Sequence, residues 1–349
     1  GLRHPRTMFG FRNDGGWKEW AIFDGTPVLV PEGFNTDPEP DGSILMYPEG
    51  DQSVAPSGHM PKNGFYFDAI VRQGEVDYDN LDPEDNLQEF GPISDVDLEY
   101  FRAEAERLHR ESNRAIFADF GGTGFGDIAL VPAAWLKEQP RGIRAIEDWY
   151  MATAANQDYI YAVFERQCEI ALENLVKLHA AVGDRVDIIF VTGTDFGTQR
   201  GPFISPKAYR TLYQPFHRRV NDWVHANTTW KTFIHSCGSV MALIPDFLDA
   251  GFDIMNPVQC SAAMMDPHEL KRQFGERVTF WGGGVDTQQT LPNGTPDDVR
   301  AEVRERIRIF GPGGGFVFNT IHNVQPSTPI ENLVAMYEAV REFGGYPLR

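Results

Sequence analysis

From about Asp95 to the end of the chain, hydrophobic and polar positions follow two kinds of pattern, one typical of helices and one typical of strands. Stretches with apolar residues three or four positions apart predict amphipathic helices, and short apolar runs between them predict buried strands. The predicted helices cover 97–110, 158–181, 206–227, 239–250, 296–309 and 329–343. The predicted strands cover 115–118, 187–191, 232–234, 253–255, 278–281 and 316–318. Because strands alternate with helices, we expect βα units and a parallel sheet.

The region before Asp95 differs in amino-acid composition and in hydrophobic pattern. It is rich in Gly, Pro, Asp and Asn, and its strand-like pieces at 20–23, 27–30 and 64–67 are separated by turn signals. We therefore predict an irregular β-rich N-terminal elaboration, or cap, over residues 1–95. Residues 96–349 form the predicted main domain.

Polar residues and glycines follow the predicted strands at their C-terminal ends. They are Asp119, Asp195, His235, Asn256, Gly282 to Gly284 and Asn319. In a (β/α)8 barrel these strand ends converge on one mouth, which is where such enzymes carry their chemistry. No G-x-G-x-x-G follows a first strand, which argues against dinucleotide binding. We predict an α/β fold, specifically a (β/α)8 TIM barrel preceded by the β-rich elaboration.

Two of these strand ends carry side chains of the kind that bind metals. His235 and Cys237 flank Ser236 directly after one apolar run, and His322 follows another. Imidazole and thiolate are zinc ligands, and three protein ligands leave a fourth position open for substrate. The sequence therefore predicts a catalytic zinc held by His235, Cys237 and His322. Cys260 also follows a strand end, where it is either a small buried side chain or a neighbour of the metal.

Composition and charge narrow the range of partners. The chain has 349 residues and a formal net charge of −19, which argues against nucleic acid and anionic membranes as partners. No apolar run reaches the roughly 18 residues of a membrane-spanning helix, and the first residues resemble no signal or transit peptide. Three cysteines are too few and too unevenly spaced for a disulfide framework. We expect a cytoplasmic protein.

Several motifs together resemble the uroporphyrinogen decarboxylase superfamily. They are His235-Ser-Cys-Gly238, Phe252-Asp-Ile-Met-Asn-Pro-Val-Gln259, Phe280-Trp-Gly-Gly-Gly-Val-Asp286, Pro326-Ser-Thr-Pro-Ile-Glu-Asn-Leu333 and the segment from Thr194 to Pro206. Within the superfamily they are most similar to the zinc-dependent, corrinoid-linked methyltransferases. The resemblance implies a (β/α)8 barrel with a metal at its mouth.

Two departures from the family pattern matter. Many of these methyltransferases carry a cysteine where this chain has His322. Imidazole can replace thiolate as a zinc ligand, but a site with one thiolate keeps a net charge of +1, which favours polarisation of an oxygen over activation of a thiol. In addition, the arginine-bearing N-terminal motif of the decarboxylases is absent.

The resemblance implies a zinc-dependent methyltransferase of the O-demethylase type. It would take a methyl group from a small-molecule donor, such as a methoxylated aromatic compound, and pass it to cobalamin on a separate corrinoid protein. The residues themselves leave a corrinoid, a thiol and a pterin open as methyl acceptor. From their positions, Asp195, Asn256, Gln259 and Asp286 are candidates for binding substrate or holding the ligands. The alternatives are a metal-free decarboxylase or lyase and a non-catalytic zinc-binding subunit. The resemblance also suggests a homodimer.

Overall fold

The structure is a computed structural model that describes residues 1–123 and 125–346. The chain divides into two compact units, Gly1–Asp187 and Ile188–Arg349. Each unit contains a hydrophobic cluster of its own.

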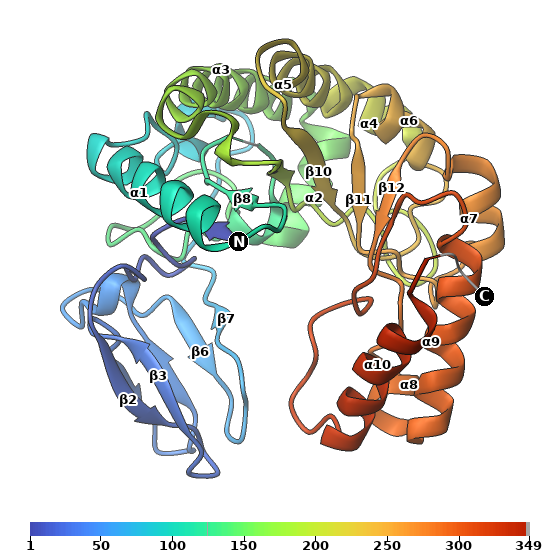
Figure 1. Cartoon of the computed structure of the whole chain (residues 1–349). Helices are drawn as coiled ribbons and strands as arrows, with labels where there is room; N and C mark the ends of the chain where they lie inside the picture. The colour runs from blue at the N-terminus through green and yellow to red at the C-terminus, as the bar shows by residue number, and fades with distance from the viewer. Residues whose placement is uncertain (124, 347–349) are drawn as a thin grey trace. The chain divides into compact units, whose positions relative to one another are not determined.

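The second unit is a series of βα units (Figure 1). Its strands β9 to β13 follow one another in sheet order as well as in sequence, and each pair of neighbours is parallel. The alternation predicted from the sequence is therefore confirmed here. In chain order the elements are β9 (Ile188–Thr192), α4 (Pro206–Leu212), α5 (Gln214–Asn227), β10 (Lys231–His235), α6 (Ile244–Asp249), β11 (Ile254–Asn256), α7 (Pro267–Phe274), β12 (Thr279–Trp281), α8 (Thr290–Asn293), α9 (Pro296–Phe310), β13 (Phe316–Val317) and α10 (Ile330–Phe343).

Prolines shorten two of the predicted helices. The pattern over 206–227 is split between α4 and α5, and Pro215 lies in the first turn of α5. Proline has no N–H to donate, and its ring clashes with the preceding helical turn, so a continuous helix cannot pass through it. In the same way α6 begins beside Pro245, five residues after the predicted start at 239.

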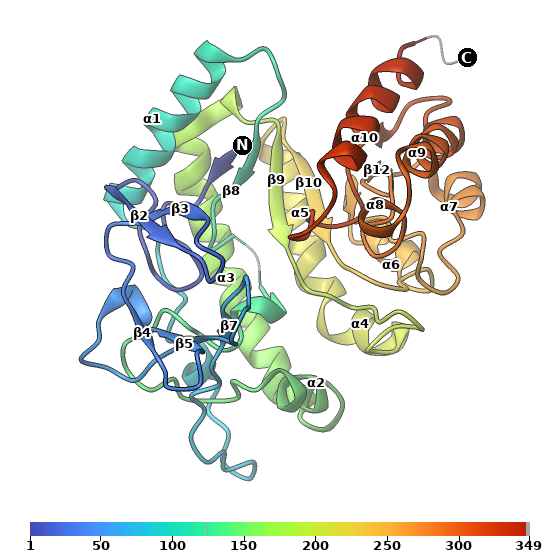
Figure 2. The ribbon, with the colours of Figure 1, turned by 90° about the horizontal axis from the view of Figure 1, so that it is seen from below.

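The last helices of the second unit are held by capping and by a shared core. Thr295 and Asp298 form a reciprocal capping box at the start of α9, which satisfies backbone N–H groups that a helix leaves unpaired. Helices α9 and α10 lie against each other (Figure 2). Buried residues from the two helices, among them Val299, Val303 and Met336, form one hydrophobic cluster.

The first unit mixes short strands with long helices. Strands β1 (Leu2–Arg3) and β8 (Phe117–Asp119) pair in parallel. The antiparallel strands are β2 (Trp17–Ala21) with β3 (Pro27–Pro31), and β4 (Thr36–Pro38), β5 (Ile44–Met46), β6 (Gly58–Met60) and β7 (Asp68–Ala69). The α-helices are α1 (Asp95–Glu111), α2 (Ile146–Ala155) and α3 (Gln157–Val182), and short 3₁₀ helices lie at Pro48–Gly50, Pro83–Asn86, Ile128–Leu130 and Gly183–Arg185.

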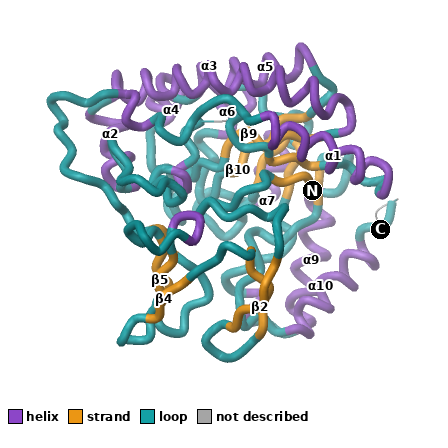
Figure 3. The backbone as a smooth tube through the Cα atoms, turned by 90° about the vertical axis from the view of Figure 1, so that its left-hand side faces the viewer, coloured by secondary structure: helices purple, strands orange, loops and turns teal. Residues whose placement is uncertain are grey.

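The region before α1 is largely loop and short strand around β2, β4 and β5 (Figure 3). Its core is aromatic, with Phe9, Phe11 and Phe34 buried together. The predicted β-rich character is thus found, but the predicted strand at 64–67 is wrong. Asn63 has a positive φ of 61° and Gly64 N donates to the Pro61 carbonyl, so the chain turns over residues 61–64, and the next strand, β7, begins only at Asp68.

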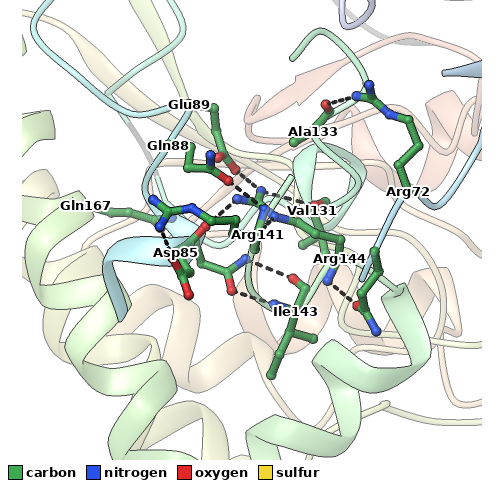
Figure 4. A network of polar contacts seen from close by, with 12 residues as sticks. Arg72, Asp85, Gln88, Glu89, Val131, Ala133, Arg141, Ile143, Arg144 and Gln167 are labelled. Carbon is green, nitrogen blue, oxygen red and sulfur yellow. Dashed lines mark hydrogen bonds and ion pairs between the residues drawn. The ribbon is translucent and has the colours of Figure 1, made fainter. Parts of the chain in front are cut away.

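A buried ion pair ties several loops of the first unit together (Figure 4). The Arg144 side chain is fully buried and its Nη1 donates to Glu89 Oε1 over 2.6 Å. The same guanidinium donates to the carbonyls of Arg141 and Asp85. Its hydrogen bonds therefore satisfy a charge that would be costly to bury alone.

The predicted fold class is confirmed in its coarser form, as a mixed α/β protein with parallel strands in both units. Closure into an eight-stranded barrel and a domain boundary at residues 95/96 stay predictions. Among the helices of residues 1–123 and 125–346, none combines the length and the apolar character that crossing a membrane requires.

Candidate metal centre

The His-Ser-Cys-Gly motif forms a tight turn at the end of β10. Ser236 N donates to the Asn256 carbonyl, and Ser236 Oγ accepts from Phe196 N over 2.9 Å. Gly238 has a φ of 85°, and a Cβ atom there would lie 2.4 Å from the carbonyl oxygen of Gly197. Only glycine fits a left-handed position packed so closely against another backbone. The turn therefore directs His235 and Cys237 to the same side.

The structure brings the three predicted ligands together. Single ligand atoms of His235, Cys237 and His322 all lie within 4.8 Å of one another. His235 Nε2 is 3.4 Å from Cys237 Sγ, which matches the separation of about 3.6 Å between ligands of a tetrahedral zinc. Among the residues that the structure describes, this is the one group of three or more His, Cys, Asp or Glu side chains with metal-binding spacing. The donor set of two imidazoles and one thiolate suits zinc.

Asn256 fixes the orientation of His235. Asn256 Nδ2 donates to the Trp281 carbonyl over 2.9 Å, so its Oδ1 must face the imidazole, where it lies 2.7 Å from Nδ1. An amide oxygen only accepts hydrogen bonds, and His235 Nδ1 therefore carries the ring proton. This tautomer leaves the Nε2 lone pair directed toward Cys237 Sγ, as metal binding requires.

We expect Asn256→Ala to weaken zinc binding by roughly 10- to 100-fold, the usual cost of losing a side chain that orients a ligand. Competition with a chelator measures the affinity, and ¹⁵N–¹H spectroscopy of the metal-free protein reports the His235 tautomer, which should become mixed in the variant. Asn227→Ala is the matched control, because the Asn227 side chain bonds to Trp223 O at the exposed end of α5. An unchanged affinity with a mixed tautomer would contradict this role.

Asp195 adds negative charge beside the cluster. Its Oδ1 accepts from Cys237 N over 2.7 Å and lies 3.8 Å from His235 Nε2. Burial and the nearby Asp195 carboxylate raise the pKa of Cys237 well above its usual range. Partial burial lowers the pKa of His322, and the electrostatic effect of the neighbouring His235 lowers it further. Without a cation the site therefore favours a neutral thiol and a neutral imidazole.

The other residues predicted to bind substrate have structural partners. Gln259 is buried and its Oε1 accepts from Gly238 N over 2.8 Å, so it supports the turn that carries Cys237. Asp286 is buried and its Oδ1 accepts from Gln288 N and Gln289 N in its own loop. A substrate-binding role for Asp195, Asn256, Gln259 and Asp286 stays a prediction. The role of the Trp281 carbonyl could not be predicted, because a backbone acceptor has no signature in residue type.

Cys260 lies outside the group of three. Burial raises its pKa to about 11, with Arg306 and Glu302 as the nearest charged influences. Cys260 therefore serves as an internal reference for substitutions at Cys237.

Comparison with known proteins supports a family assignment. The family model of uroporphyrinogen decarboxylase (URO-D) matches residues 142–343, which include His235, Cys237 and His322. A uroporphyrinogen decarboxylase of Coxiella burnetii is 37% identical over 78 residues, 22% of this chain and 21% of that protein. The methylcobamide:CoM methyltransferase MtaA of Methanosarcina barkeri is 25% identical over 186 residues, 52% of this chain and 49% of that protein.

Two further comparisons come from Methanosarcina mazei. Its methylated-thiol--coenzyme M methyltransferase is 29% identical over 167 residues, 48% of this chain and 40% of that protein. A solved methyltransferase structure from this organism has a TM-score of 0.52 and 17% identity, covering 74% of this chain and 70% of that one, and it supports a shared fold. The matches span less than half the length of these three curated relatives.

The predicted resemblance, including similarity to the methyltransferases of the superfamily, is confirmed. Because the family model covers more than half of the chain, this protein belongs to the uroporphyrinogen decarboxylase (URO-D) family.

Proposed function

We propose that this protein is a zinc-dependent methyltransferase that removes the methyl group of a methoxylated aromatic compound and transfers it to a corrinoid protein. The observation that carries the proposal is the convergence of His235, Cys237 and His322, with ligand atoms within 4.8 Å of one another. The names of two relatives, a methylcobamide:CoM methyltransferase and a methylated-thiol--coenzyme M methyltransferase, support methyl transfer as the reaction class.

Hydrogen bonds and close packing hold the candidate ligands in a defined geometry. Asn256 orients His235, Asp195 and Gln259 bond to the backbone N–H groups of Cys237 and Gly238, and Gly197 packs against Gly238. Such prior ordering keeps a catalytic group from reorganising during the reaction. When bound, zinc would supply Lewis acidity toward the ether oxygen of the donor, which is otherwise a poor leaving group.

The ligand set favours an oxygen donor. One thiolate and two neutral imidazoles together carry one negative charge. With a second thiolate in place of His322, the three ligands would together carry two negative charges. A zinc ion with fewer anionic ligands is more electrophilic. It therefore stabilises an alkoxide or phenoxide leaving group better than it generates a nucleophilic thiolate. This charge difference leads us to propose a methyl ether as donor and a corrinoid as methyl acceptor.

The experiment combines the zinc-loaded protein with cob(I)alamin and a methoxybenzoate and follows the visible spectrum of the corrinoid. We expect methylcobalamin to form with release of the hydroxybenzoate, at a rate proportional to the protein concentration. A parallel reaction with uroporphyrinogen tests the decarboxylase alternative. Decarboxylation without dependence on zinc, or no methyl transfer from any methoxylated donor, would overturn the proposal.

A further inference from the structure

Three aromatic side chains from neighbouring strands of the second unit contact one another. Phe190 of β9 and Phe233 of β10 stand opposite each other in the parallel pair, and their ring centroids are 5.9 Å apart. The Phe233 ring also lies 5.5 Å from the Trp281 ring of β12, at an interplanar angle of 83°. These contacts place the three rings on one face of the sheet. We call Phe190, Phe233 and Trp281 the aromatic triad.

The aromatic triad shares this face with the metal ligand His235. Phe233 and His235 are two residues apart in β10, which pairs with β11 in unbroken register over both positions. Side chains two residues apart in a strand point to the same face and are separated by about 6.6 Å. This separation is comparable to the length of a benzene ring that carries one methoxy group.

The opposite face of the same strands is ordinary core. Ile234, Met255 and Phe280 are at most 1% exposed, and the Phe280 ring contacts Phe310 of α9. On the face that carries His235, by contrast, Phe190 and Trp281 are partly exposed. Branched aliphatic side chains usually dominate the inner face of barrel strands. Core packing alone therefore does not explain partly exposed aromatic rings beside a metal ligand.

We propose that the aromatic triad binds the ring of the methyl donor and so selects aromatic over aliphatic methyl ethers. Aromatic rings attract one another in edge-to-face and offset-stacked arrangements, beyond the effect of burying their area. A ring held against Trp281 and Phe233 would direct its methoxy oxygen along the strands toward His235. This inference rests on the proposed function, because it takes the donor to be a methoxylated aromatic compound.

Binding of two donors tests the selectivity. Methoxybenzoate and methoxyacetate share a methoxy group and a carboxylate, but only the first has a ring. Isothermal titration calorimetry with the zinc-loaded protein measures both dissociation constants without requiring turnover. Trp281→Leu should weaken binding of methoxybenzoate by roughly 10-fold and leave that of methoxyacetate unchanged. Trp281→Phe should restore most of the loss, because it returns an aromatic ring.

Two controls separate this role from damage to the fold or to the metal centre. Trp281→Leu keeps the backbone carbonyl that accepts from Asn256, so zinc affinity measured by competition with a chelator should equal that of the wild type. Trp223→Leu makes the same chemical change at a partly exposed tryptophan of helix α5 and should change neither dissociation constant. Thermal unfolding of each variant checks that the fold is retained.

The outcomes distinguish this inference from the proposed function. An equal loss of affinity for both donors in Trp281→Leu, or unchanged binding of methoxybenzoate, would overturn the role of the aromatic triad. A wild type that binds methoxyacetate as tightly as methoxybenzoate would do the same. If Trp281→Leu loses affinity for methoxybenzoate alone but the wild type forms no methylcobalamin from it, the aromatic triad stands and methyl transfer fails.

Discussion

Replacing Cys237 by serine is expected to lower the zinc affinity of the protein by more than about 100-fold, beyond the usual cost of losing an orienting side chain. Cys237 supplies the one thiolate among the three proposed ligands, and a serine hydroxyl neither ionises near neutral pH nor matches the affinity of sulfur for zinc. The turn itself should persist, because its hydrogen bonds use the backbone of residues 236–238. Methyl transfer should fall with metal content.

Cys260→Ser is the control for this experiment, since it makes the same chemical change outside the group of three. Zinc per chain is measured by atomic spectroscopy after dialysis, and affinity by competition with a chelator. Cys260→Ser should keep the wild-type zinc content. If Cys237→Ser also kept it, Cys237 would not be a ligand and the proposed centre would be wrong.

The second large effect is expected at His322, and it separates binding from reactivity. His322→Ala should remove one ligand and weaken zinc binding by more than about 100-fold, as at Cys237. His322→Cys should retain the metal, because thiolate is an equally suitable zinc ligand. It also adds a negative charge to the centre, so the rate with a methyl ether should fall even though zinc remains bound.

Comparing the two His322 variants by zinc content and by methyl transfer distinguishes these effects. His268→Ala is the control histidine variant, because His268 is exposed and lies 3.7 Å from Glu305, away from the cluster. A His322→Ala variant with unchanged zinc affinity would show that His322 is not a ligand. A His322→Cys variant with unchanged ether reactivity would contradict the charge argument.

The candidate centre lies entirely within the unit Ile188–Arg349, which explains why the sequence could anticipate much of it. His235 ends a run of apolar residues, and a parallel strand that ends there must deliver the next side chains at the strand's C-terminal edge. The short spacing from His235 to Cys237 then restricts both side chains to one turn. The positions of His235 and Cys237 in the candidate centre could therefore be predicted from the local sequence.

Other features depend on contacts between distant segments and had no local signature. The role of Asn256 requires both the Trp281 carbonyl and the His235 ring, which lie 25 and 21 residues away in the chain. Gln259 supports Gly238 across a similar distance. The breaks beside Pro215 and Pro245 were visible in the sequence, but the amphipathic pattern continued through them and predicted longer helices.

The central claim is that a zinc ion held by His235, Cys237 and His322 is required for methyl transfer. Its most direct test strips the wild-type protein of metal, titrates zinc back and follows methylcobalamin formation at each step. We expect activity to be lost on stripping and to return in proportion to added zinc, reaching its limit at about one zinc per chain, as for a single three-ligand site. Full activity in the stripped protein, or saturation of zinc without any activity, would contradict it.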